Sequence, residues 1–117
     1  MVGIQISKEL NDKVYEAIES AKSTGKLKKG VNEVTKAIEK DKARLVAIAK
    51  DVTPPEIVMH LPLLAEERNI VAVEVSSREE LGASAGIEVP TVAVAITEPG
   101  DAKALIEEII EEIKKSK

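Results

Sequence analysis

Three short runs of small and β-branched apolar residues recur along the chain and have the length of single strands. They are Leu45–Ala49, Ile70–Val75 and Thr91–Ile96. Valine and isoleucine suit a pleated surface, and an apolar run without polar alternation is typical of a strand that is covered on both faces. The pattern therefore predicts three buried strands inside a sheet.

Helical spacing of apolar residues fills the segments between and around these runs. The last segment is the clearest, because four isoleucines and one leucine between positions 105 and 113 form a single apolar stripe. Pro62 should kink or divide the third helix, since proline lacks the N–H that an interior turn requires. The five predicted helices are Lys8–Ser23, Asn32–Asp41, Pro55–Arg68, Ser77–Ala85 and Asp101–Lys115.

The order of these elements indicates the fold class. Strands that alternate with helices predict an α/β fold, here a three-layer α-β-α sandwich around a small mixed β-sheet. With 117 residues, of which 44% are hydrophobic, the chain is large enough for one compact domain with a modest core. Because no repeat or linker divides it, we expect residues 1–117 to form a single domain.

The amino-acid composition excludes several kinds of chemistry. The sequence has no cysteine and one histidine, His60, so it offers no disulfide, thiolate metal site, thiol nucleophile or histidine cluster. No apolar run approaches the roughly 20 residues that span a bilayer, and the first residues lack the apolar stretch of a signal peptide. These features predict a cytoplasmic protein without a metal, a cofactor or a membrane partner.

Charge is unevenly distributed along the chain. The net charge of −4 argues, by itself, against a partner with a phosphate backbone. Between Lys22 and Arg44, however, eight basic and three acidic residues give a local charge of +5, so the remainder carries −9. A basic segment on an acidic body can dock on phosphate at one defined site and repel it elsewhere. A solvated lysine-rich loop explains the same charge equally well.

The segment KKGVNEVTK, residues 28–36, carries the most specific pattern. If a helix begins here, Asn32, Lys36 and Lys40 recur every four residues on its outer face. Asparagine, glutamate and lysine can all bond base edges, and lysine can also bond phosphate. The competing interpretation is ordinary helix capping, with Asn32 as the N-cap and Glu33 favoured by the helix dipole. Spacing alone leaves both interpretations open.

This segment and those that follow it resemble the archaeal large-subunit ribosomal protein L7Ae family. The resemblance runs in unbroken order from about Gly25 to Pro99. Relatives include a spliceosomal protein, a small nucleolar ribonucleoprotein subunit and another ribosomal protein that shares the sandwich. The matching segments are GVNEVTK, LVAIAKDV, PEIV, HLPLL, LG and AGIEVP, which begin at Gly30, Leu45, Pro55, His60, Leu81 and Ala85.

The resemblance implies recognition of the kink-turn, a sharply bent RNA element with tandem sheared G·A pairs. In the family, a Gly-x-Asn-Glu-x-x-Lys helix start reads these pairs, and a second surface holds one flipped-out nucleotide. The residues that match the first surface are Gly30, Asn32, Glu33 and Lys36, with Lys29 and Lys40 near the RNA backbone. The residues that match the second surface are Thr53, Ile57, Arg78, Ile87, Glu88, Val89 and Val92.

Aromatic content limits how RNA could be recognised. Tyr15 is the only aromatic residue, so the chain cannot assemble a platform on which single-stranded bases stack. Recognition would have to use hydrogen bonds and aliphatic contacts. That restriction favours a structured RNA over a loose strand.

The resemblance implies a non-enzymatic monomer that binds kink-turns or kink-loops in ribosomal RNA and in box C/D and H/ACA guide RNAs. Its implied partners are the large ribosomal subunit and, by analogy, the scaffold protein and the methyltransferase of the box C/D particle. A second interpretation is a structural or protein-interaction sandwich that has lost RNA binding. The net charge favours it, as does Thr53, where relatives carry an acidic residue. An enzyme is the least supported class, since no nucleophile, acid–base pair or cofactor loop can be assembled.

Overall fold

A single mixed sheet forms the centre of the molecule. The computed structural model describes residues 4–52, 56 and 58–115, and within them five strands pair in the order β1-β4-β3-β5-β2. β1, β4 and β3 run parallel, whereas β5 is antiparallel to both of its neighbours. The strands are β1 (Ile4–Gln5), β2 (Lys26–Lys29), β3 (Leu45–Ala49), β4 (Ala72–Val75) and β5 (Ala93–Glu98).

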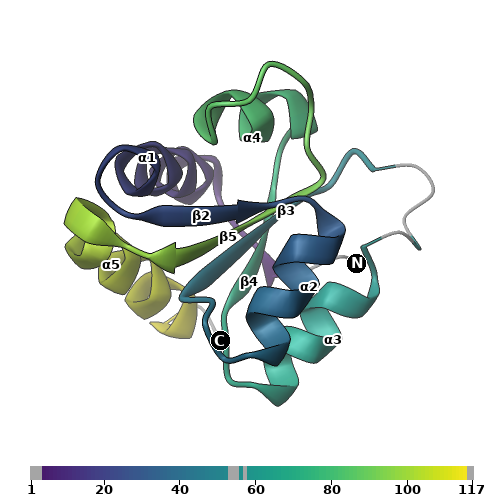
Figure 1. The fold of residues 1–117 in the computed structure, drawn as a ribbon. Coiled ribbons are helices and arrows are strands. Elements are labelled where there is room, and N and C mark those ends of the chain that lie inside the picture. Colours follow the sequence, from purple (N-terminus) through teal and green to yellow (C-terminus); the bar gives the residue numbers. More distant parts are fainter. Residues whose placement is uncertain (1–3, 53–55, 57, 116–117) are drawn as a thin grey trace.

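Helices cover both faces of the sheet. The second and third helices pack side by side on one face, and the other three lie on the opposite face (Figure 1). This arrangement confirms the predicted three-layer α-β-α sandwich. The helices are α1 (Lys8–Thr24), α2 (Val31–Glu39), α3 (His60–Glu67), α4 (Arg78–Ser84) and α5 (Lys103–Lys115), and a short 3-10 turn, η2 (Gly100–Ala102), precedes the last.

The core lies on both sides of β3, the middle strand. All five of its residues are buried, as the apolar run predicts. Ile18 of α1, Ile38 of α2 and Ile109 of α5 reach toward the sheet and are each exposed by 1% or less. Full burial of a side chain of this size contributes roughly 1.5–3 kcal/mol, so the two helical layers are held mainly by such contacts.

The two outer strands are missing from the sequence-based prediction. β2 escapes detection because three of its four residues are exposed lysines and only Leu27 is partly buried. An outer strand pairs along one side only, so it tolerates polar side chains, and lysines there discourage pairing with other chains. Most of the basic segment is therefore an ordered strand followed by a helix, and the turn after α2 carries Lys40, Lys42 and Arg44. The segment as a whole is not the loop that its charge alone allowed.

The third helix begins later than its apolar pattern predicts. The predicted span starts at Pro55, which lies outside the described residues, whereas α3 starts at His60. Pro62 is the third residue of α3, which continues through it to Glu67, because the N–H groups of a first turn have no intrahelical acceptor to lose. His60 Nε2 and Thr35 Oγ1 lie 3.0 Å apart, and this hydrogen bond ties α3 to α2.

Candidate functional site

The turn between β2 and α2 depends on the backbone of Gly30. This residue precedes the helix with φ 89° and ψ 156°, a region that is accessible almost only to glycine. Its N–H donates to the carbonyl of Ala93 at 2.9 Å, and its own carbonyl accepts from the N–H of Val34 at 3.0 Å. A Cβ at this position would meet no atom of the described chain within 4 Å. Conformation rather than crowding therefore requires glycine here, and the outer side of the turn is open.

Asn32 and Glu33 lie exposed in the first turn of α2. The N-cap is Gly30, and no side chain in the described ranges caps the helix, so the interpretation of Asn32 as a capping residue is wrong. The Asn32 amide bonds no residue in the part of the chain that the structure describes. Glu33 sits where the helix dipole favours a carboxylate, as predicted. Both side chains are available to a ligand.

The rest of α2 separates polar from apolar side chains as its spacing predicts. Val34 and Ile38 are fully buried against the sheet. Lys36 and Lys40 are exposed and follow Asn32 at intervals of about one helical turn. The helix therefore presents an amide and two ammonium groups in one row.

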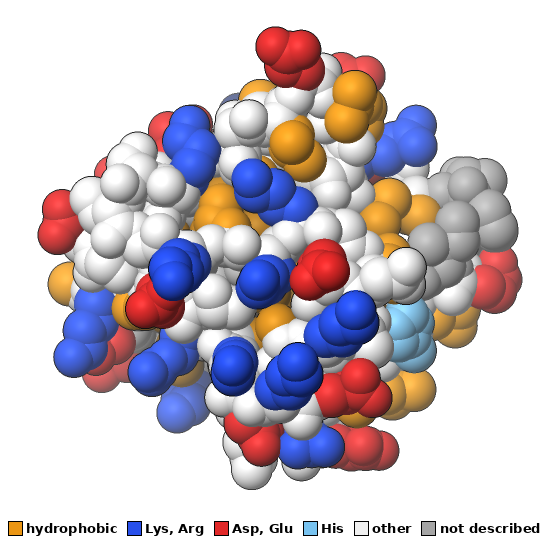
Figure 2. All heavy atoms as spheres, in the orientation of Figure 1, with side chains coloured by type: hydrophobic (Ala, Val, Ile, Leu, Met, Phe, Trp, Pro, Cys, Tyr) orange, Lys and Arg blue, Asp and Glu red, His pale blue; other side chains and the backbone are white. Residues whose placement is uncertain are grey.

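Lysines of β2 extend this row into a wider basic surface. Lys and Arg side chains gather over β2 and α2 on the face drawn in Figure 2. One of them, Lys26, forms an exposed ion pair with Glu98, with Nζ 3.3 Å from Oε2. Within the described ranges, Lys28 and Lys29 of β2, like the lysines of α2, form no ion pair. Their charge is available to an anionic partner.

The loop from α4 to β5 carries four residues of the second predicted surface: Ile87, Glu88 and Val89, which are consecutive, and Val92 at its end. The N–H of Ile87 donates to the carbonyl of Gly82 at 3.0 Å, which fastens the loop to α4. A Cβ on Gly82 would lie 2.3 Å from the carbonyl oxygen of Val89, so glycine permits this close packing. The Val89 side chain is 63% exposed. The loop thus presents an aliphatic side chain to solvent from a fixed backbone.

The residues of the second surface other than 87–89 lie at the start of α4, immediately before β5, or outside the described residues. Arg78 begins α4; its N–H donates to Asp51 Oδ1 at 2.9 Å, and its Nε lies 3.9 Å from Asp51 Oδ2. Val92, immediately before β5, is half-buried. Thr53 and Ile57 lie outside the described residues. Ser77 is the N-cap of α4. Asp51, which was not among the predicted site residues, adds a hydrogen bond to the first residue of the helix and helps to orient Arg78.

Two backbone hydrogen bonds bring the two predicted surfaces together. The carbonyl of Ala93 accepts from Gly30 at 2.9 Å, and the carbonyl of Val92 accepts from Ala49 at 3.0 Å. The segment that enters β5 therefore lies between the start of α2 and the end of β3 (Figure 1). The residues near position 30 and the loop before Val92 share one end of the sheet, although some 60 positions separate them in the sequence.

Side chains of α1 hold the segment before α4, a role that the sequence does not reveal. The Asn11 amide donates to Ser76 Oγ at 3.2 Å and accepts from the N–H of Ser76 at 2.9 Å. The hydroxyl of Tyr15 accepts from the N–H of Ser77 at 3.1 Å and donates to its carbonyl at 3.2 Å. Burial raises the pKa of Tyr15 above its usual value. These partners are too distant in sequence for any local pattern to pair them.

Two other kinds of site find no support in the described residues. Residues 4–52, 56 and 58–115 contain no group of three or more His, Asp or Glu side chains placed to hold a metal ion. Over the same ranges, no helix combines the length and apolarity needed to cross a membrane.

The fold and the candidate site place this protein in a class of single-domain α-β-α sandwiches. In this class, a helix that follows a glycine turn presents polar side chains at one end of the sheet. The chain belongs to the ribosomal protein L7Ae/L30e/S12e/Gadd45 family, whose model matches residues 12–106. A solved structure of the Giardia lamblia 15.5kD RNA binding protein is similar to it, with a TM-score of 0.89 and 31% identity. That match covers 94% of this chain and 92% of the other. The resemblance to the family is thereby confirmed.

Proposed function

We propose that this protein binds kink-turns or kink-loops in structured RNA, with the start of α2 as the reading element. The observation that carries the proposal is the exposed Asn32 amide, which has no partner in the described chain and stands directly after the open glycine turn. Membership of the family and the similarity to the Giardia lamblia 15.5kD RNA binding protein support it.

The side chains at the start of α2 match the chemistry of sheared G·A pairs. The Asn32 amide can donate and accept at a base edge, and the Glu33 carboxylate can accept from guanine amino or imino groups. Lys36 can donate to guanine O6 or to a phosphate oxygen. Gly30 leaves room for close approach of the RNA, because glycine has no side chain and, apart from its chain neighbours, no atom of the described residues lies within 4 Å of where a Cβ would stand. Lys29 and Lys40 would contact the backbone on either side.

The second surface would hold one flipped-out nucleotide. An extruded base needs an apolar slot for its faces and a few polar groups for its edges. Val89 is exposed and Val92, three residues further along the chain, is half-buried; Ile57 would complete the slot. Arg78, Thr53 and the loop residues Ile87 and Glu88 would supply edge and backbone contacts.

At the cellular level, the proposed role is that of a cytoplasmic, monomeric, non-enzymatic subunit of ribonucleoprotein particles. The RNA targets would be ribosomal RNA of the large subunit and box C/D and H/ACA guide RNAs. In the box C/D particle, the bound kink-turn would recruit the scaffold protein and the methyltransferase, and this chain would contribute no catalytic group.

A gel-shift titration tests the proposal with two RNAs: a kink-turn, and the same RNA with its G·A pairs replaced by Watson–Crick pairs. We expect binding of the replaced RNA to be weaker by at least about tenfold, since one lost bidentate base contact is worth about 1–3 kcal/mol. Equal affinity for both RNAs would refute specific recognition. Failure to bind either would favour the alternative, an interaction domain without RNA affinity.

A further inference from the structure

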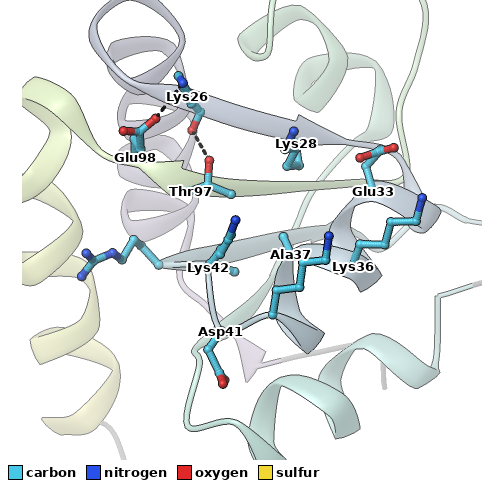
Figure 3. A pocket seen from close by; sticks show the side chains of 12 residues that line it. Lys26, Lys28, Glu33, Lys36, Ala37, Asp41, Lys42, Thr97 and Glu98 are labelled. Carbon is cyan, nitrogen blue, oxygen red and sulfur yellow. Dashed lines mark hydrogen bonds and ion pairs between the residues drawn. The ribbon is translucent and has the colours of Figure 1, made fainter.

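A groove of about 750 Å³ continues from the start of α2 along the basic face. Figure 3 shows β2 on one side of it and α2 with the following turn on the other, with the end of β5 between them. Small side chains, Ala37, Ala43 and Thr97, form part of its lining. The cationic side chains on its walls are Lys26, Lys28, Lys36, Lys40, Lys42 and Arg44.

The carboxylates of this groove do not cancel its positive charge. Six cations and three carboxylates line it, which leaves an excess of three positive charges. Two of those carboxylates are already paired: Asp41 Oδ2 with Arg68 Nη1 at 3.1 Å, outside the groove, and Glu98 with Lys26. Within the described ranges, the other five lining cations have no ion pair. The rest of the chain, at a total of −4, carries −7, so an anionic polymer is attracted to the groove and repelled elsewhere.

The turn that presents Lys42 and Arg44 has a fixed backbone. The N–H of Lys42 donates to the carbonyl of Ala37 at 2.9 Å, and the N–H of Arg44 donates to the carbonyl of Ile96 at 2.7 Å. Both charges therefore project from a backbone tied to α2 and to β5. The groove holds its row of cations without a partner being bound.

We propose that this groove holds the sugar-phosphate backbone of one strand of the RNA stem that continues from the G·A pairs. The inference rests on the proposed function, because Glu33 and Lys36 line the groove and also belong to the reading surface. A stem whose G·A pairs lie on the start of α2 would extend along the outer face of this helix toward Lys42 and Arg44. Lys36 and Lys40 are separated by about 6 Å along the helix axis, which is the order of the spacing between successive phosphates.

The experiment compares kink-turn RNAs that differ only in stem length. One RNA has the stem on the G·A side extended by a full helical turn, a second has it cut short beyond the G·A pairs, and a third has only the opposite stem extended. Each is titrated from about 50 to 200 mM salt against the wild type and a variant with Lys42→Ala and Arg44→Ala. A variant with Lys114→Ala and Lys115→Ala, in the last turn of α5, removes the same charge outside the groove.

The groove variant should lose affinity only for the RNA with the long stem on the G·A side. Its plot of log affinity against log salt should be shallower than that of the wild type by about 2, one unit for each lost phosphate contact. Similar losses on the short-stem RNA, or equal losses in the α5 variant, would overturn the proposal. Dependence of affinity on the G·A pairs separates the groove proposal from the proposed function. If affinity still depends on these pairs but not on stem length, the groove does not bind the stem, and the proposed function stands.

Discussion

At the scale of single residues, Gly30 makes the site possible through its backbone. The Gly30→Ala variant should lose about 1–3 kcal/mol of unfolding free energy, because φ 89° with ψ 156° is a strained conformation for any residue with a Cβ. Urea unfolding of wild type and variant measures this loss. Crowding cannot produce this loss, since beyond the chain neighbours no atom of the residues that the structure describes lies within 4 Å of the new methyl group. An unchanged free energy would contradict the strain argument.

Replacement of Gly82 should affect only the second surface. In the Gly82→Ala variant, the added Cβ would collide with the carbonyl oxygen of Val89, 2.3 Å away, and push the loop from α4. We expect preference for the identity of the flipped-out nucleotide to fall, while the ratio of affinities for intact and G·A-replaced RNA stays the same. Gel-shift titrations with each of the four nucleotides at that position measure the first effect. Unchanged preference would show that the loop does not form the nucleotide slot.

At the scale of whole elements, α2 should divide its work between base contacts and phosphate contacts. If Lys36 bonds a phosphate, the Lys36→Ala variant should show a plot of log affinity against log salt that is shallower by about 1. If Lys36 instead bonds guanine O6, the slope should stay near that of the wild type and discrimination at one base pair should fall. The Val89→Glu variant serves as the contrast, because the wild-type valine carries no charge that releases counterions. Replacing this valine should leave the contacts of the wild type to phosphate in place, and with them most of the slope.

The stability that Tyr15 contributes by joining α1 to the segment before α4 should depend on pH. Because burial raises the pKa of folded Tyr15, the contribution of the neutral phenol to stability is complete below the unfolded value of about 10 and is lost as pH rises through the folded value. The difference in unfolding free energy between the wild type and Tyr15→Phe should therefore shrink from pH 9 to pH 11. Parallel pH curves for the two proteins would exclude this link.

The elements that the sequence predicts best are those whose pattern comes from burial. β3 is recovered residue for residue, since an apolar run flanked by layers on both faces leaves no other interpretation. β2 is missed because its stability comes from pairing with β5, including Leu27 with Ile96, rather than from its own apolar content. The start of α3 is misplaced because the apolar spacing continues upstream of His60, where the helix does not.

At the scale of the whole molecule, the sequence predicts the composition of the site better than its assembly. Asn32, Lys36 and Lys40 can be placed on one exposed face from one segment, because they recur every four residues, and the resemblance to the family adds Glu33. The proximity of this helix start to the loop before Val92 depends on the antiparallel pairing of β2 with β5, which no local pattern encodes. The groove also escapes sequence analysis, since its cations come from a strand, a helix and a turn.

The central claim is that Asn32 reads the G·A pairs of a kink-turn rather than stabilising its own helix. A double-mutant cycle tests it most directly: wild type and Asn32→Ala are each titrated with the intact RNA and with the G·A-replaced RNA, and the unfolding free energy of both proteins is measured. We predict a loss of at least about tenfold in affinity for the intact RNA, with a stability change within about 0.5 kcal/mol. The affinity for the replaced RNA should be the same for both proteins. Equal losses on the two RNAs, or a stability loss of about 1 kcal/mol that accounts for the weaker binding, would contradict the claim.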